Sequence, residues 1–163
     1  MTWTVAPEAF DSPVAAALWR AYYTEVSDRW YLLHEGRRTD PDELEREIAA
    51  NTGAELAPPD GRLLVARYGG EPAGSAGVRL PAAQTAELTR VFLYPGMRGR
   101  GGAALLVSAA EDAARALGAT RLVLDTRGDL TEARALYARL GYTETGPYKE
   151  DPYAEHWFRK QLA

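Results

Sequence analysis

The spacing of apolar residues changes several times along the chain, and each change predicts a different secondary-structure element. After Ser12, apolar residues recur three or four positions apart at Leu18, Tyr22 and Val26, which is typical of the buried face of a helix. Ser12 is followed by a proline, and a serine cap before a proline is a favourable helix start. We therefore predict a long first helix directly after Ser12.

A shorter second helix is predicted after Asp40, which is also followed by a proline. Glu43 lies three residues after Asp40, the spacing of a capping box, and Leu44 and Ile48 supply an apolar side. The segment 51–61 contains clustered glycine and proline and is predicted to be a loop.

The rest of the chain alternates between extended runs and helical spacing. A glycine-rich turn at 69–72 separates two extended runs and predicts a hairpin. Two further helices are expected, the first with Glu111 on its polar side and the second opened by a capping box of Asp129 and Glu132. The predicted strands are 2–5, 62–68, 73–80, 86–94, 120–125, 142–145 and 155–161, and the two further helices are 101–117 and 129–140.

This order predicts an α/β (α+β) fold with a mixed, mostly antiparallel central sheet of about seven strands and about four helices on its faces. The 163 residues carry 46% hydrophobic and 26% charged residues, which is ordinary for a globular protein. We therefore expect residues 1–163 to form a single domain.

Composition excludes several functional classes. The chain has no cysteine and only two histidines, His34 and His156, so a thiolate or histidine metal centre is not expected. A net charge of −4 disfavours a nucleic-acid surface. The first residues lack the layout of a signal peptide, and no apolar run is long enough to cross a bilayer, so we expect a cytoplasmic protein.

The segment 98–104, between a predicted strand and a predicted helix, carries the most specific chemistry. Its glycines allow close approach of a ligand, the first amides of a helix have no partner within the helix, and Arg98 and Arg100 add positive charge. These features suit a phosphate or pyrophosphate, although glycines also serve simply to make a tight turn. A P-loop requires Gly-Lys-Ser/Thr, which is absent, and a dinucleotide fingerprint belongs early in a strand–helix–strand unit, so both readings are set aside.

The run 87–103 resembles the acetyl-coenzyme A signature of the GNAT superfamily of N-acetyltransferases. Arg98, Gly101 and Ala103 match its Q/R-x-x-G-x-G/A pattern, and the later run 133–142 resembles the family's A-x-x-L-Y-x-x-x-G-F/Y helix and strand. The family often has asparagine where this chain has Leu130. The resemblance implies a GNAT-like fold and acetyl-CoA as acyl donor. The implied cofactor-binding residues are Val91, Phe92, Leu93, Arg98, Gly99, Arg100, Gly101, Gly102, Ala103 and Ala104.

The resemblance also implies direct attack of an amine on the thioester. A free alkylamine has a pKa of about 10, so a carboxylate is needed to help remove its proton. Glu87 is the first candidate, because it matches a strand position where several family members keep a catalytic glutamate. Asp125, at the end of the next strand, is the rival and matches another family position for the base, so the sequence leaves the choice open. Tyr137 matches the position of a general acid that protonates the departing thiol, and it also fits a packing role.

Family analogy places the acceptor between the first two helices and the loop before the last strand. These segments are aromatic and acidic, which suits a cationic amine through cation–π attraction and charge. The candidate acceptor-binding residues are Trp19, Tyr23, Trp30, Tyr31, His34, Tyr148 and Asp151.

The leading hypothesis is an acetyl-CoA-dependent N-acetyltransferase for the primary amine of a small molecule. Two alternatives are a non-catalytic acyl-CoA sensor and a protein acetyltransferase that modifies lysines or chain termini. A homodimer is a further assembly to test, since many relatives pair. The identity of the acceptor and the length of the acyl group are not set by the sequence.

Overall fold

The computed structural model describes all 163 residues and contains one seven-stranded sheet in the order β1-β2-β3-β4-β5-β7-β6. Neighbouring strands are antiparallel except β4 and β5, which are parallel. The predicted fold class is therefore confirmed. The strands are β1 (Trp3–Glu8), β2 (Gly61–Tyr68), β3 (Glu71–Ala82), β4 (Thr85–Leu93), β5 (Arg121–Thr126), β6 (Thr143–Thr145) and β7 (His156–Gln161). The helices are α1 (Pro13–Glu35), α2 (Pro41–Ala50), α3 (Gly102–Ala116) and α4 (Thr131–Arg139), with short 3-10 turns η1 (Ala54–Leu56) and η2 (Pro95–Met97).

The alternation of side chains along β2 assigns the helices to opposite faces of the sheet. Leu64 and Ala66 belong to the main core, which also contains the buried side of α3. Leu63 and Val65 point the other way, where they pack in small clusters with the start of α1. Successive strand residues face opposite sides, so one apolar strand supports a helix on each face.

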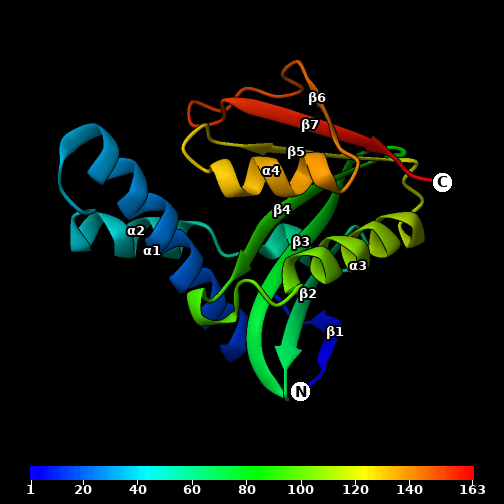
Figure 1. Cartoon of the computed structure of the whole chain (residues 1–163), viewed down its shortest axis with the longest axis horizontal. Helices are drawn as coiled ribbons and strands as arrows, with labels where there is room; N and C mark the ends of the chain where they lie inside the picture. Colours follow the sequence, from blue (N-terminus) through cyan, green and yellow to red (C-terminus); the bar gives the residue numbers. More distant parts are fainter.

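The sheet opens between β4 and β5. Their parallel ladder has three residue pairs, from Thr85–Arg121 to Glu87–Val123, although both strands continue beyond it. Figure 1 shows the two halves of the sheet fanning apart from this point, with β5, β7, β6 and α4 in one half and β1–β4 and α3 in the other. A bulge at Arg90, whose φ is 54°, bends β4 away from β5. The far end of β4 therefore has a free backbone edge.

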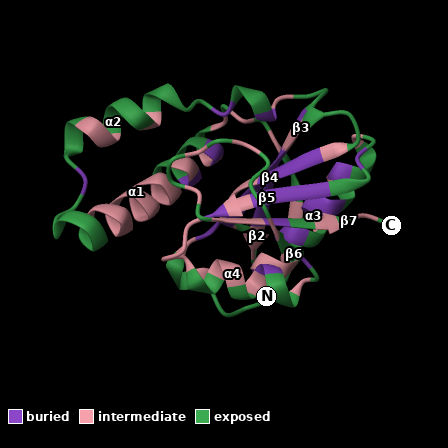
Figure 2. Cartoon of the chain, turned by 90° about the horizontal axis from the view of Figure 1, so that it is seen from above, coloured by how far each residue is buried: buried purple, intermediate pink, exposed green.

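Helix α1 starts as predicted but is only shallowly packed. The Ser12 side chain accepts a hydrogen bond from the Ala15 amide, and the helix runs for 23 residues to a left-handed Gly36. Only Ala15 and Leu18 are buried, and Figure 2 shows α1 and α2 as mostly half-buried or exposed beside the buried strands. None of the helices combines the length and apolarity that a bilayer-spanning segment needs.

Both predicted capping boxes are wrong. Asp40 caps α2, but the Glu43 carboxylate instead accepts a hydrogen bond from the Tyr31 hydroxyl at 2.6 Å. Helix α4 begins at Thr131 with no side-chain cap, because the carboxylates of Asp129 and Glu132 bind arginines. Tertiary ion pairs thus replace the local caps.

The expected position of Glu111 is also wrong. It is buried at 8% exposure on α3, where it accepts hydrogen bonds from the Tyr142 hydroxyl at 2.9 Å and from Lys160 at 3.1 Å. A buried carboxylate needs such partners, and here they come from far along the chain. Gly118 ends α3 as predicted, with a φ of 90°.

Candidate active site

The N-terminus of α3 is open to a ligand. Gly101 occupies the cap position with a φ of 83°, no side chain caps the helix, and no atom lies within 4 Å of the space a Cβ would fill. Gly99 has the same left-handed conformation and the same open space. The first amides of α3 are therefore unpartnered donors at the positive end of a helix dipole, which suits an anion.

Trp3 explains the glycine at position 102. Its indole lies so close that a Cβ on Gly102 would be 2.4 Å from the ring, and its Nε1 donates a hydrogen bond to the Arg100 carbonyl at 2.9 Å. Strand β1 therefore fixes the backbone of the turn. Ala103 and Ala104 follow in the first turn of α3, where their amides lie on the same open end.

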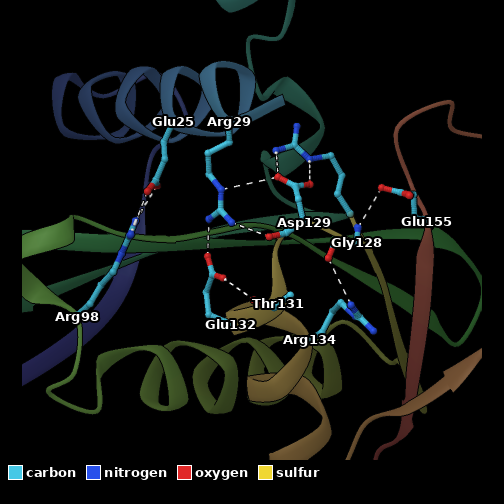
Figure 3. Close-up of polar contacts among 10 residues, drawn as sticks. Glu25, Arg29, Arg98, Gly128, Asp129, Thr131, Glu132, Arg134 and Glu155 are labelled. Carbon is cyan, nitrogen blue, oxygen red and sulfur yellow. Dashed lines mark hydrogen bonds and ion pairs between the residues drawn. The ribbon is translucent and has the colours of Figure 1, made fainter. Parts of the chain in front are cut away.

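The two arginines of the turn differ in their surroundings. Arg98 forms a bidentate ion pair with Glu25 of α1, at 2.7 and 3.0 Å (Figure 3). It also donates a hydrogen bond to the Leu93 carbonyl. This ion pair neutralises much of the Arg98 charge, and the predicted phosphate contact by Arg98 stays a prediction. Arg100 lies over the Tyr68 ring and pairs with no carboxylate, so it is the freer cation of the two.

The residues expected to contact the cofactor through their backbone lie on β4, beyond its parallel ladder with β5. The side chains of Phe92 and Leu93 are buried in opposite clusters, and Val91 packs against the main core. Their side chains are thus committed to packing. The free edge of β4 offers main-chain groups to the opening between the strands.

Glu87 and Asp125 lie close together at the point where β4 and β5 diverge, and two neighbouring residues bridge them. The Tyr148 hydroxyl lies 2.9 Å from Glu87 and 3.2 Å from Asp125. The Lys149 ammonium lies 2.9 Å from Glu87 and 3.1 Å from Asp125. Tyr148 was expected to bind the acceptor, whereas Lys149 carried no sequence signal, because its partners are far along the chain.

The two carboxylates differ in how strongly they are held. The Glu87 side chain is 4% exposed and also binds Arg79 Nε at 2.8 Å, whereas the Asp125 side chain is 22% exposed. Burial raises the pKa of Glu87, but the hydrogen bonds from Lys149 and Arg79 outweigh burial and hold this pKa below its ordinary value. Glu87 is therefore a poor proton acceptor at neutral pH.

Tyr137 is buried in the main core, where its ring packs against Tyr142 and Phe158. Burial, followed by repulsion from Tyr22 and Asp125, raises the pKa of Tyr137 well above its ordinary value. No hydrogen bond within the chain contributes to this shift. The hydroxyl thus stays protonated at neutral pH and can donate.

A cavity of about 370 Å³ lies between α1, α2 and the loop before β7. We call it the aromatic cavity, since six aromatic residues line it. Its residues are Trp19, Tyr22, Tyr23, Val26, Ser27, Trp30, Tyr31, Thr39, Glu43, Glu47, Asp125, Thr126, Arg127, Leu130, Asp151, Tyr153 and Ala154. Asp125 is the member that belongs both to this cavity and to the bridged carboxylate pair.

The structure brings most of the expected acceptor residues into the aromatic cavity. Trp19, Tyr23, Trp30, Tyr31 and Asp151 line it. Two expected residues lie outside its wall. His34 is exposed beside Trp30, with 4.6 Å between ring centres, and Tyr148 lies with the carboxylate pair.

The charge of the aromatic cavity is negative. Its wall contains the carboxylates of Glu43, Glu47, Asp125 and Asp151 and a single cation, Arg127. Asp129 already holds Arg127 through two contacts, at 2.9 and 3.1 Å. The cavity therefore favours a cationic ligand.

Ion pairs tie α1 across the opening to the start of α4. Arg29 donates to the Asp129 carbonyl at 2.6 Å and pairs with Glu132 at 2.5 Å (Figure 3). With the Glu25–Arg98 pair, they hold one helix against both sides of the opening. This network positions the wall of the aromatic cavity.

The described chain thus combines a sheet that opens between two strands, an uncapped helix N-terminus and a cavity lined by α1 and α2. The sequence profile of the acetyltransferase (GNAT) family matches residues 16–142. The chain belongs to this family.

The chain is also similar to individual proteins. It is 35% identical to the IAA acetyltransferase of Azospirillum brasilense over 57% of this chain and 61% of that one. The chain thus spans about half to three fifths of the length of the curated relatives that it matches.

Solved structures share the fold over the whole chain. A GNAT acetyltransferase of Staphylococcus aureus Mu50 superposes with a TM-score of 0.77 at 12% identity, over 99% of this chain and all of that one. The PaiA N-acetyltransferase of Thermoplasma acidophilum, solved with coenzyme A, gives a TM-score of 0.73 at 15% identity, over 99% of both chains.

Proposed function

We propose that this protein is an acetyl-CoA-dependent N-acetyltransferase that modifies a small cationic amine. The observation that carries the proposal is the position of Asp125. This carboxylate lines the aromatic cavity and lies just beyond the β4–β5 ladder, which ends at the pair Glu87–Val123.

The donor half uses main-chain groups. Acetyl-CoA supplies the activated acyl group, and the amides at Gly101, Gly102, Ala103 and Ala104 bind its pyrophosphate, with Arg100 adding charge. Those main-chain groups of Val91, Phe92 and Leu93 that face away from β3, on the free edge of β4, bind the pantetheine arm and stabilise the developing oxyanion. The open space at Gly99 and Gly101 supports this assignment.

We assign the base to Asp125 rather than to Glu87. A base must reach the acceptor and must be able to take its proton. Asp125 lines the cavity, is 22% exposed and contacts one cation and a hydroxyl, whereas Glu87 is almost inaccessible and is held by two cations and a hydroxyl. Glu87 then keeps Tyr148 and Lys149 in place, and Tyr137 acts as the proton donor to the departing thiol.

The acceptor is a small molecule with a positive charge and an apolar part. Six aromatic rings and four carboxylates around a partly open cavity of about 370 Å³ suit such a molecule better than an extended peptide. Trp19, Tyr23, Trp30 and Tyr31 bind the apolar part, and Asp125 and Asp151 attract the charge.

The test is the release of coenzyme A thiol during incubation with acetyl-CoA and a panel of amines. Aromatic monoamines, aliphatic diamines, neutral amines and lysine-containing peptides are compared. Asp125→Asn is expected to lower kcat/KM about 100-fold or more and to remove the acidic limb of the pH profile. Glu87→Gln, the matched control, is expected to keep that limb.

Three results would contradict parts of the proposal. Tight acetyl-CoA binding without turnover of any amine indicates a sensor. Turnover of peptides alone excludes the small-molecule acceptor. Loss of the acidic limb in Glu87→Gln but not in Asp125→Asn reverses the choice of base.

A further inference from the structure

The chain has only two lysines among its 19 lysines and arginines, and both lie on carboxylates. The Lys160 Nζ lies 3.1 Å from each carboxylate oxygen of Glu111 on α3. Lys149 lies on the connection between β6 and β7 and bridges Glu87 and Asp125. Of the two lysine amines, only that of Lys149 contacts the carboxylate that we assign as the base.

The Lys149 ammonium occupies the kind of position that an acceptor amine needs. Its Nζ is 3.1 Å from an Asp125 oxygen, within the hydrogen-bond reach that proton transfer requires. The side chain is 34% exposed, so it is neither sealed in the core nor fully hydrated. The carboxylates hold it at the diverging ends of β4 and β5, where the proposed donor site opens.

We propose that Lys149 is a self-acetylation site, modified by the protein's own active site when no other amine fills the aromatic cavity. The inference rests on the proposed function, because it uses the same acyl donor and the same base. It goes beyond that function by assigning a covalent modification to the chain itself.

The chemical step is that of any amine acceptor. The Lys149 ammonium gives one proton to the Asp125 carboxylate, and the freed lone pair forms a bond to the thioester carbonyl carbon. The carbon–sulfur bond breaks, and coenzyme A leaves as the thiol after the thiolate takes a proton from Tyr137, which the nitrogen replaces with its second proton as it becomes an amide. The products are acetyl-lysine, coenzyme A and the one proton that Asp125 returns to solvent.

The modification would alter the site that performs it. Acetyl-lysine is neutral and cannot pair with carboxylates, so Glu87 and Asp125 would both lose the cation that bridges them. Asp125 would then present an uncompensated negative charge to the aromatic cavity. The acetylated protein is therefore expected to bind cationic amines more tightly than the unmodified protein.

The experiment incubates the purified full chain with acetyl-CoA alone and follows the intact mass and the peptide map. We expect one added acetyl group, located at Lys149, at a rate on the order of 100-fold above Lys160 because Lys149 is held beside the base. The rate constant should be independent of protein concentration and should rise with pH from 6 to 9, since the amine must be deprotonated. Asp125→Asn should abolish the selectivity for Lys149.

Lys149→Arg keeps the cation but has no amine at this position, so it should lose the fast modification and keep only the slow one at Lys160. Equal modification of Lys149 and Lys160, or a rate constant that scales with protein concentration, would overturn the inference. The same preparation is tested with the amine panel. Turnover of amines with Lys149 unmodified refutes self-acetylation alone, whereas no acetyl-CoA binding and no turnover refute the proposed function.

Discussion

The burial of Glu87 gives the sharpest prediction of stability. Glu87→Gln keeps the shape of the side chain and removes its charge. In the native protein this carboxylate accepts hydrogen bonds from Arg79 and Tyr148 and pairs with Lys149, while only 4% of its side chain is exposed. The substitution therefore leaves two cations without their shared anion.

The expected loss follows from the exposure of these partners. Removing one member of a fully buried pair costs about 3–5 kcal/mol, and a hydrogen bond to a charged group contributes about 1.5–3 kcal/mol. Arg79 and Lys149 are each 34% exposed and can partly turn to water, so the lower range applies. We expect a loss of about 2 kcal/mol, which corresponds to a fall in Tm of about 4–8 °C for a chain of this length.

Thermal unfolding followed by circular dichroism measures this loss, with Glu45→Gln as the matched control. Glu45 pairs with Arg20 at 2.5 Å, but both side chains are more than half exposed, so its replacement should leave Tm unchanged. Equal Tm values for the two variants would refute the reasoning that burial makes the Glu87 contacts strong.

The pH dependence provides an independent check. The pKa of Glu87 lies below its ordinary value of 4.5 in the folded protein. Its contribution to stability is therefore complete above pH 4.5 and is lost as the pH falls through the folded-state pKa. The difference in Tm between the wild type and Glu87→Gln should be constant from pH 8 to 5 and should narrow below 4.5. A difference that widens on acidification would contradict the assignment.

Two further predictions concern the proposed donor site. Tyr137→Phe should lower kcat about 100-fold with unchanged acetyl-CoA affinity. The control Tyr142→Phe removes the neighbouring hydroxyl, which is bound to Glu111, and should leave kcat unchanged. An unchanged kcat in Tyr137→Phe would exclude the acid role. Gly101→Val should weaken acetyl-CoA binding by about tenfold or more, measured by calorimetry. The control Gly36→Val strains a similar left-handed position with equally open space, so it should lower stability without changing the affinity for acetyl-CoA. Equal acetyl-CoA affinities in the two variants would refute the anion site.

Local signals in the sequence predicted the elements well. The Ser12 cap, the glycine turn between β2 and β3, and the glycine that ends α3 depend on neighbours within a few residues, and the structure contains each of them. The order of strands and helices followed from these signals. The aromatic and acidic residues of the acceptor region were also found, because they cluster in two short segments.

Long-range pairing could not be predicted from these patterns. The ion pair of Arg98 with Glu25, which lies 73 positions away in the sequence, had no local signal. Glu43 and Glu132 stand at capping-box positions in the sequence. In the structure, the Glu43 carboxylate instead binds the Tyr31 hydroxyl and that of Glu132 binds Arg29. Lys149 had no local pattern at all, because its two carboxylate partners lie on strands far from it in the sequence.

The shallow attachment of α1 has a consequence for how such a protein can change over time. This helix supplies seven of the 17 residues around the aromatic cavity, yet only two of its own residues are buried. Substitutions on its exposed and half-buried positions cost little folding free energy, since large losses come mainly from buried sites. Single mutations in α1 can therefore change which amine is preferred. The main core, on the opposite face of the sheet, keeps the proposed acyl-donor site in place.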